Sequence, residues 1–103
     1  MNKQFTLSYL PLFEDDIAAA RDYIAHDLQN PAAALRLVED TERAILKRLE
    51  NPLAFKPYHS NRDRQRPYYR INIRNYSVFY VVIDDVMEVR RFVYSRRDLA
   101  KII

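Results

Sequence analysis

The first half of the chain changes from a strand pattern to a helix pattern. In the segment QFTLSYL, Phe5, Leu7 and Tyr9 alternate with polar residues, which predicts a strand. After Pro11, apolar residues recur every three or four positions, which predicts an amphipathic helix that runs to about Asp27. The apolar stripe of this helix consists of Phe13, Ile17, Ala20, Ile24 and Leu28.

A second helix is expected after the sequence QNPAAA. Asn30 is suited to the N-cap position and Pro31 to the first helical position. Asn51 precedes Pro52, and a residue before proline avoids helical geometry, so the helix should end there. Because the connection between the two helices is short, we expect an antiparallel hairpin. The apolar side of the second helix carries Ala34, Leu37, Val38, Thr41, Ala44, Ile45 and Leu49.

Three strands are predicted in the second half, after an aperiodic basic loop at residues 53–67. The segment YYRINIR alternates, with Tyr69, Ile71 and Ile73 on one face. The segment YSVFYVVID is apolar on both faces, as is typical of a central strand. The segment MEVRRFVYS follows the turn residues Asp84 and Asp85 and forms the last strand. The remaining segment RRDLAKII forms a short helix or a tail.

This β-α-α-β-β-β order indicates the α+β class. We expect an antiparallel helical hairpin packed on one face of a mainly antiparallel sheet. The 103 residues suit a single domain that spans positions 1–103. No apolar run approaches the ~20 residues that span a bilayer, and the N-terminus lacks the pattern of a signal peptide. A soluble, cytoplasmic protein without a membrane partner is therefore expected.

Composition excludes several kinds of chemistry. The chain has no cysteine, which excludes disulfides and thiolate zinc sites. It has no glycine, which excludes a glycine-rich phosphate loop and a dinucleotide-binding fingerprint. The histidines His26 and His59 are far apart and have no acidic residues at metal-ligand spacing. We therefore predict no metal and no cofactor.

Charge is distributed unevenly along the chain. Residues 1–55 contain six Lys/Arg and nine Asp/Glu, whereas residues 56–103 contain eleven Lys/Arg and five Asp/Glu. A basic second half indicates a polyanionic partner, either a nucleic acid or an acidic protein segment.

Arginines are concentrated around the last strand, in the sequence RRFVYSRRD. On a regular strand Arg90, Phe92 and Tyr94 share one face, and Val89, Arg91 and Val93 share the other. Since only one face can pack on the helices, Arg90 or Arg91 should line the open face of the sheet. The neighbouring strand should add Arg70 and Arg74 to this anion-binding surface. The alternative is that these arginines pair with nearby carboxylates or are solvated, which contributes only ~0–1 kcal/mol per surface pair.

The segment from Tyr69 to Ile103 resembles the C-terminal half of the RelE/ParE superfamily of bacterial toxins. The likeness lies in a strand ending in Asn-Tyr, the aromatic VFY strand, an acidic turn and the SRRD ending. The segment LPLFEDDIAAARDYIAHDLQNPAAALRLVEDTERAILKRLENP is similar to the family's helical hairpin. The resemblance implies the toxin of a type II toxin–antitoxin module, silenced by a cognate antitoxin in a hetero-oligomer. A mostly disordered antitoxin segment should fold across the basic sheet and the hairpin groove.

The superfamily has two kinds of target, and both stay open here. RelE-like members cut messenger RNA on the ribosome without a metal, which needs a base, a cation and an acid. The candidates for such catalysis are Tyr94, Arg96 and Arg97. However, the chain has Ser77 where RelE itself carries an arginine, and it lacks the His-Tyr or Tyr that some nuclease branches carry close to the C-terminus. A ParE-like poison of DNA gyrase is therefore the first hypothesis.

Two alternatives accompany it. One is a ribosome-dependent mRNA endonuclease, and the other is an interaction module without toxicity. The expected residues for binding a target or nucleic acid are Arg70, Arg74, Arg90, Arg91, Arg96 and Arg97.

Overall fold

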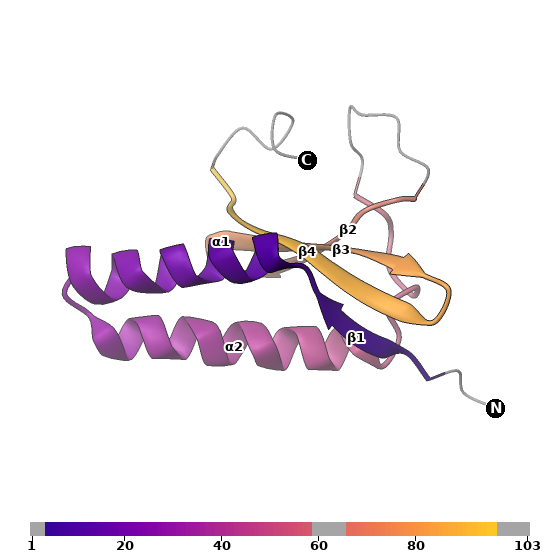
Figure 1. Cartoon of the computed structure of the whole chain (residues 1–103), viewed down its shortest axis with the longest axis horizontal. Coiled ribbons are helices and arrows are strands. Elements are labelled where there is room, and N and C mark those ends of the chain that lie inside the picture. The colour runs from indigo at the N-terminus through magenta and orange to yellow at the C-terminus, as the bar shows by residue number, and fades with distance from the viewer. Residues whose placement is uncertain (1–3, 59–65, 97–103) are drawn as a thin grey trace.

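The computed structural model describes residues 4–58 and 66–96 and shows two helices packed on a four-stranded sheet (Figure 1). The elements are β1 (Thr6–Tyr9), α1 (Pro11–Asp22), η1 (Tyr23–Asp27), α2 (Pro31–Leu49), β2 (Tyr69–Ile73), β3 (Tyr76–Ile83) and β4 (Val86–Tyr94). The strand order is β1-β4-β3-β2, in which β1 runs parallel to β4 and the other pairs are antiparallel. The predicted α+β class and mainly antiparallel sheet are confirmed. The expected helix or tail after Arg96 lies outside the described residues.

The main core lies between the helical hairpin and one face of the sheet. Figure 1 shows α1 and α2 side by side, and apolar residues of both helices pack against β2, β3 and β4. The predicted alternation of Tyr69, Ile71 and Ile73 is confirmed, since all three are buried in this core. The fully buried members of the core include Ile45, Val78, Tyr80, Met87 and Val89.

The junction between the helices uses no glycine. The first helix continues from α1 into the π-helical turn η1, so its predicted end at about Asp27 is confirmed. Gln29 then takes the left-handed conformation with φ of 51°, which glycine would adopt most readily. The side chain of Asn30 accepts a hydrogen bond of 3.1 Å from the backbone N–H of Ala33. This bond confirms the predicted N-cap of α2.

Strand β4 contains a β-bulge at Arg90. Its pairing with β3 skips this residue between Val89 and Arg91, so inward and outward positions exchange beyond it. Val89 and Phe92 therefore both pack in the helix-side core, whereas Val93 packs on the opposite face of the sheet. The prediction that Arg90 shares a face with Phe92, and Val89 with Val93, is wrong for this reason.

The opposite face of the sheet carries a second, smaller apolar cluster. Phe79 and Val81 have no exposed surface and pack with Tyr68 and Val93. Tyr58, which pairs with Tyr68 as an isolated bridge, packs edge-on against Phe79 at 5.1 Å between ring centroids. Aromatic and aliphatic side chains cover this area, so the expectation of a free face is wrong there. The guanidinium groups of Arg70 and Arg90 nevertheless lie on this face, 5.6 Å from the ring centroid of Tyr58 and 5.7 Å from that of Tyr68.

Arg48 at the end of α2 anchors the chain segment that follows the helix. Its guanidinium donates hydrogen bonds to the hydroxyl of Tyr80 at 3.0 Å and to the carbonyl of Arg70 at 3.3 Å, and it lies 3.6 Å from the ring centroid of Phe55. The Tyr80 hydroxyl donates in turn to the carbonyl of Pro52 at 2.7 Å. Burial raises the pKa of Tyr80, and Arg48 opposes this shift. In the part of the chain that the structure describes, no helix is long and apolar enough to span a membrane.

Candidate functional site

A large cleft lies where the helical hairpin turns. It encloses about 760 Å³ between the helices, the turn that joins β2 to β3, and the adjoining ends of β3 and β4. The helices contribute Asp15, Asp16, Ala19, Ala20, Tyr23, Ile24, Leu28, Ala33 and Leu37, and the strands and their turn contribute Arg74, Asn75, Tyr76, Phe92 and Tyr94. We call this site the hairpin cleft. Its lining is mostly apolar, as is usual for a binding site.

Aromatic rings form the strand side of the hairpin cleft. Tyr76 stacks on Phe92 at 4.7 Å between centroids and meets Tyr94 edge-on at 5.5 Å. Burial raises the pKa of Tyr76, and the nearby phenols of Tyr94 and Tyr23 raise it further. Tyr76 is therefore neutral at physiological pH and cannot serve as a general base there.

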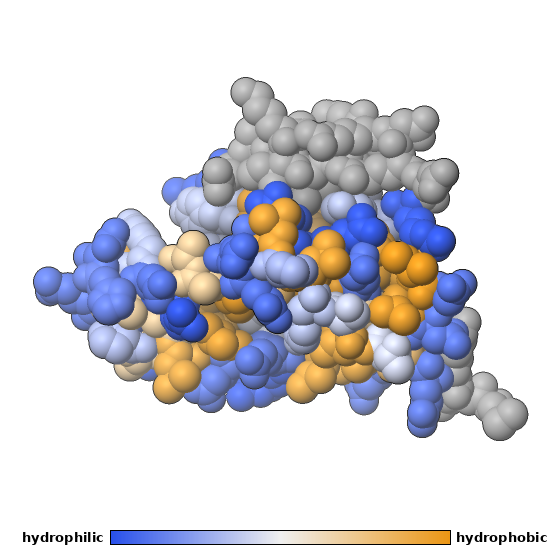
Figure 2. Space-filling view, viewed as in Figure 1, coloured by the Kyte–Doolittle hydropathy of each residue, from blue (hydrophilic) through white to orange (hydrophobic). Residues whose placement is uncertain are grey.

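Large apolar side chains at the rim of the hairpin cleft remain accessible. Tyr23 is 48% exposed, Leu28 57% and Tyr94 36%. Leu28 belongs to the apolar stripe predicted for the first helix, yet it lies outside the core. Figure 2 shows that hydrophobic residues also gather in separate patches on the helical face of the molecule. Accessible aromatic and aliphatic groups beside a cleft are typical of a surface that binds another protein.

The turn η1 determines how Tyr23 and Leu28 lie at this rim. The backbone N–H of Leu28 donates to the carbonyl of Tyr23 at 3.1 Å, which is the wide turn of a π-helix. The N–H of Asn30 donates to the carbonyl of Ile24 at 3.1 Å, which closes the helix end. Short π-helical turns are frequent at functional sites.

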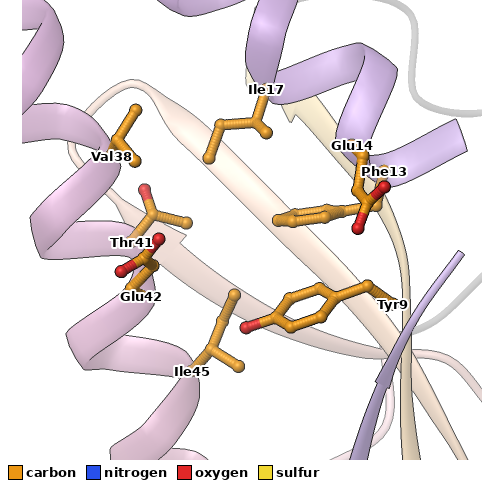
Figure 3. A pocket seen from close by; sticks show the side chains of 8 residues that line it. All are labelled: Tyr9, Phe13, Glu14, Ile17, Val38, Thr41, Glu42 and Ile45. Carbon is orange, nitrogen blue, oxygen red and sulfur yellow. The ribbon is translucent and has the colours of Figure 1, made fainter. Parts of the chain in front are cut away.

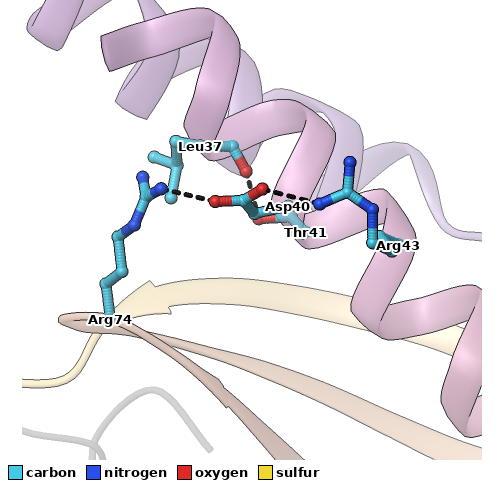
Figure 4. Close-up of polar contacts among 5 residues, drawn as sticks. All are labelled: Leu37, Asp40, Thr41, Arg43 and Arg74. Carbon is cyan, nitrogen blue, oxygen red and sulfur yellow. Dashed lines mark hydrogen bonds and ion pairs between the residues drawn. The ribbon is translucent and has the colours of Figure 1, made fainter.

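Arg74 does not lie with Arg70 on the open face of the sheet. It occupies the turn between β2 and β3 with φ of 55°, a strained conformation for a residue with a Cβ. Its guanidinium pairs with Asp40 of α2, which also accepts a hydrogen bond of 3.0 Å from Arg43 (Figure 4). The expected position of Arg74 is therefore wrong, because a carboxylate on the helix holds it on the helical side.

Arg91 is also bound by an acidic residue of the helical hairpin. Its guanidinium donates to both carboxylate oxygens of Asp16, at 2.8 and 3.2 Å. The same carboxylate accepts a 3.0 Å hydrogen bond from the backbone N–H of Phe92. The pairing of β4 with β1 ends at Val89, and Asp16 accepts the backbone N–H of Phe92 beyond that point.

Arg90 lies on the open face, as expected of one of the two adjacent arginines, but it is not a free cation. Its guanidinium donates to Glu88 at 2.8 Å and to the hydroxyl of Tyr68 at 3.4 Å. Burial lowers the pKa of Arg90, yet the bonds to Tyr68 and Glu88 outweigh it, so the net shift is upward. The alternative stated for these arginines, pairing with carboxylates of the same chain, therefore holds for Arg74, Arg90 and Arg91.

Arg70 has no carboxylate partner among the described residues. It donates to the hydroxyl of Ser77 at 2.8 Å, and its guanidinium lies 5.9 Å from the ring centroid of Phe79. Ser77 is fully buried and also contacts Ser95 at 3.0 Å. According to the resemblance, RelE carries an arginine at the position of Ser77. In this chain the Ser77 side chain is instead buried and hydrogen-bonded to Arg70 and Ser95.

The three catalytic candidates do not form a described cluster. Tyr94 packs on Tyr76, and Arg96 is exposed and makes no ion pair within the described part of the chain. Arg97 lies outside the described residues. Residues 4–58 and 66–96 also contain no group of His, Asp and Glu that could hold a metal ion. Whether Tyr94, Arg96 and Arg97 have a catalytic role stays a prediction.

Sequence reasoning missed Tyr23, Leu28 and Tyr76 as cleft residues, and Asp16 and Asp40 as arginine partners. A weak signal existed for Leu28, because it is the last member of its stripe and directly precedes the break between the helices. No local signal links Asp40 to Arg74, since the two are 34 positions apart.

Comparisons with known proteins agree with the fold and with the family resemblance. Residues 7–99 match the family described as the ParE toxin of the type II toxin–antitoxin system parDE. A solved structure of the chromosomal ParDE toxin–antitoxin system from P. aeruginosa matches with a TM-score of 0.69. That match has 16% sequence identity and covers 89% of this chain and 97% of the other. No curated protein matches the chain significantly. Because the family match covers most of its length, the chain belongs to the ParE toxin family of type II toxin–antitoxin systems.

Proposed function

We propose that this ParE-family toxin acts by binding DNA gyrase in the cytoplasm and does not cut RNA. The observation against RNA cleavage is the internal pairing of three of the six arginines expected to bind a target or nucleic acid. Arg74, Arg90 and Arg91 each bind a carboxylate of the same chain. Metal-free RNA cleavage requires a cation that faces the reacting phosphate together with a base and an acid. A guanidinium already held by a carboxylate is poorly suited to that role.

The buried position of Ser77 supports the same conclusion. A nuclease of the RelE type would need a cationic side chain at this position, directed at substrate. Here the Ser77 hydroxyl is fully buried and accepts a hydrogen bond from Arg70, so no cationic side chain projects from this position. Inhibition through surface binding requires no such constellation.

A pair of assays with the purified toxin separates the hypotheses. In a DNA supercoiling assay with gyrase, we expect the toxin to inhibit the enzyme. In a translation reaction with programmed ribosomes, we expect the message to stay intact. Cleavage of the message at A-site codons would replace this proposal with the endonuclease alternative. Normal growth of cells that express the toxin alone would instead favour the module without toxicity.

We further propose that a segment of the cognate antitoxin occupies the hairpin cleft in a toxin–antitoxin hetero-oligomer. The rim residues Tyr23, Leu28 and Tyr94 offer apolar area that the monomer leaves accessible. A disordered segment that folds on binding can bury such area along an extended surface. Because Arg74 and Arg91 near the cleft are already paired, apolar anchoring should dominate over arginine contacts.

A further inference from the structure

A second pocket lies between the two helices and β1, apart from the hairpin cleft. It encloses about 180 Å³ and shares no lining residue with the cleft. Its walls are the side chains of Phe13, Ile17, Val38 and Ile45, and the ring of Tyr9 crosses one side (Figure 3). The volume exceeds that of a few water molecules, each of which takes up about 30 Å³ in the liquid. The pocket can therefore admit one side chain from outside.

Two carboxylates stand at this pocket, one on each helix. Figure 3 shows Glu14 on α1 and Glu42 on α2 on opposite sides of the cavity. Both residues are exposed, and neither forms an ion pair among the described residues. Both act on the phenol between them: after burial, which has the largest effect, Glu42 and then Glu14 raise the pKa of Tyr9.

Helix stability explains only part of this arrangement. Glu14 lies in the first turn of α1, where a carboxylate interacts favourably with the helix dipole. Glu42 lies in the middle of α2, where the dipole gives no such advantage. Neither role explains why two unpaired negative groups flank an open apolar pocket.

We propose that this pocket binds a lysine side chain of a partner protein. The aliphatic stem would contact Ile17, Val38 and the ring of Tyr9, which are all partly exposed, and the ammonium group would lie between Glu14 and Glu42. A lysine suits the site because its four-carbon stem is flexible and its ammonium group has three rotatable donors. An arginine fork is matched to one coplanar carboxylate, whereas these two carboxylates come from different helices. The assignment depends on neither the gyrase target nor the occupant of the hairpin cleft.

The site can be tested on the purified toxin by NMR with a pair of small probes. N-acetyl-lysine-methylamide carries the proposed group, and N-acetyl-norleucine-methylamide carries a similar stem without the charge. We expect the lysine probe to shift the methyl resonances of Ile17 and Val38 in a saturable way, and the norleucine probe to bind several-fold more weakly. Equal affinity for both probes, or no shift with the lysine probe, would overturn the proposal.

Substitutions test whether the lysine probe binds in this pocket. The double substitution Glu14→Gln and Glu42→Gln should weaken binding of the lysine probe by roughly tenfold, since each exposed ionic contact makes a modest contribution. The matched control Glu39→Gln removes an exposed carboxylate of α2 outside the pocket and should leave the affinity unchanged. Val38→Phe should abolish binding by filling the cavity while both carboxylates remain. Retained affinity in the double variant or in Val38→Phe would contradict the assignment.

Discussion

The two ends of the helical hairpin differ in how their side chains are buried and hydrogen-bonded within the chain. At the end where α2 finishes, Ile45 is fully buried, and Arg48, Tyr80 and Pro52 form a continuous set of hydrogen bonds. At the end where the hairpin turns, Tyr23 and Leu28 are about half exposed beside a large cleft. Leu46, Leu53 and Phe55 beside the first end are also about half exposed. The two ends differ because the polar groups of the first are paired within the chain, whereas the second borders a large cleft that a partner can occupy.

This difference separates residues that stabilise the fold from residues that are available for binding. An exposed apolar side chain adds little to the free energy of folding, and exposed apolar surface beside a cleft is typical of a site that binds another molecule. The arginines can also be divided into those that stabilise the fold and those that are available for binding. Most of those described near the cleft are held by carboxylates of the helices, which makes them part of the fold.

The largest expected effect contrasts one side chain at each end. Ile45→Ala should lower the free energy of unfolding by about 2–5 kcal/mol, because it removes buried methyl groups and leaves a cavity. Leu28→Ala should change it by less than about 0.5 kcal/mol, because the side chain is largely exposed. Urea unfolding followed by circular dichroism measures both. Similar losses for the two variants would erase the distinction between the ends.

A second expectation concerns the hydrogen bonds at the completed end. Tyr80→Phe leaves the carbonyl of Pro52 without its donor and removes one acceptor from Arg48. An unpaired buried polar group costs about 1–3 kcal/mol, so we expect a loss of stability in that range. Tyr94→Phe is the matched control at the exposed rim. A variant Tyr80→Phe as stable as the natural protein would mean that these bonds add nothing to the fold.

The sequence predicted the regular parts of the molecule well and the irregular parts poorly. Tyr69, Ile71 and Ile73 follow a local period, and their burial was predictable from it. The bulge at Arg90 was not, because it depends on how β4 pairs with β3. The pairing of Arg74 with Asp40 depends on the packing of α2 against the sheet, which no local pattern encodes.

A third expectation concerns the affinity of the cognate antitoxin for the end where the hairpin turns. Tyr23→Ala and Leu28→Ala should each weaken the complex with the cognate antitoxin by about tenfold, as is usual for apolar anchors of an interface. Leu35→Ala provides a control, because Leu35 is 60% exposed and does not line the cleft. Isothermal titration calorimetry gives the affinities. A larger loss for Leu35→Ala than for the two rim variants would place the antitoxin elsewhere.

Salt dependence of the same complex is expected to be small. Paired arginines contribute little further attraction, and screening weakens exposed charges most. Between about 0.1 and 1 M salt, where the Debye length falls from about 10 to 3 Å, we expect only a slight change in affinity. A steep fall would show that cationic contacts dominate and that the ion pairs open on binding.

The smallest effect is expected from pH. Burial raises the pKa of Tyr76 in the folded protein above that of the unfolded chain. Its contribution to stability is therefore fully present below about pH 10, the ordinary pKa of tyrosine, and is lost as pH rises through the folded pKa. Tyr76→Phe should reduce the loss of stability above pH 10 and leave its slope at neutral pH unchanged. An altered slope near pH 7 would contradict this account.

Hydrogen exchange of the toxin, alone and with its cognate antitoxin, tests most directly whether the hairpin cleft is the binding surface. We expect the amides of η1 and of the last residues of β4 to gain protection in the complex, because both elements line the cleft. Amides around Ile45 should change little, since that end is already buried. Protection confined to residues outside the cleft, with η1 exchanging as in the free toxin, would contradict the account.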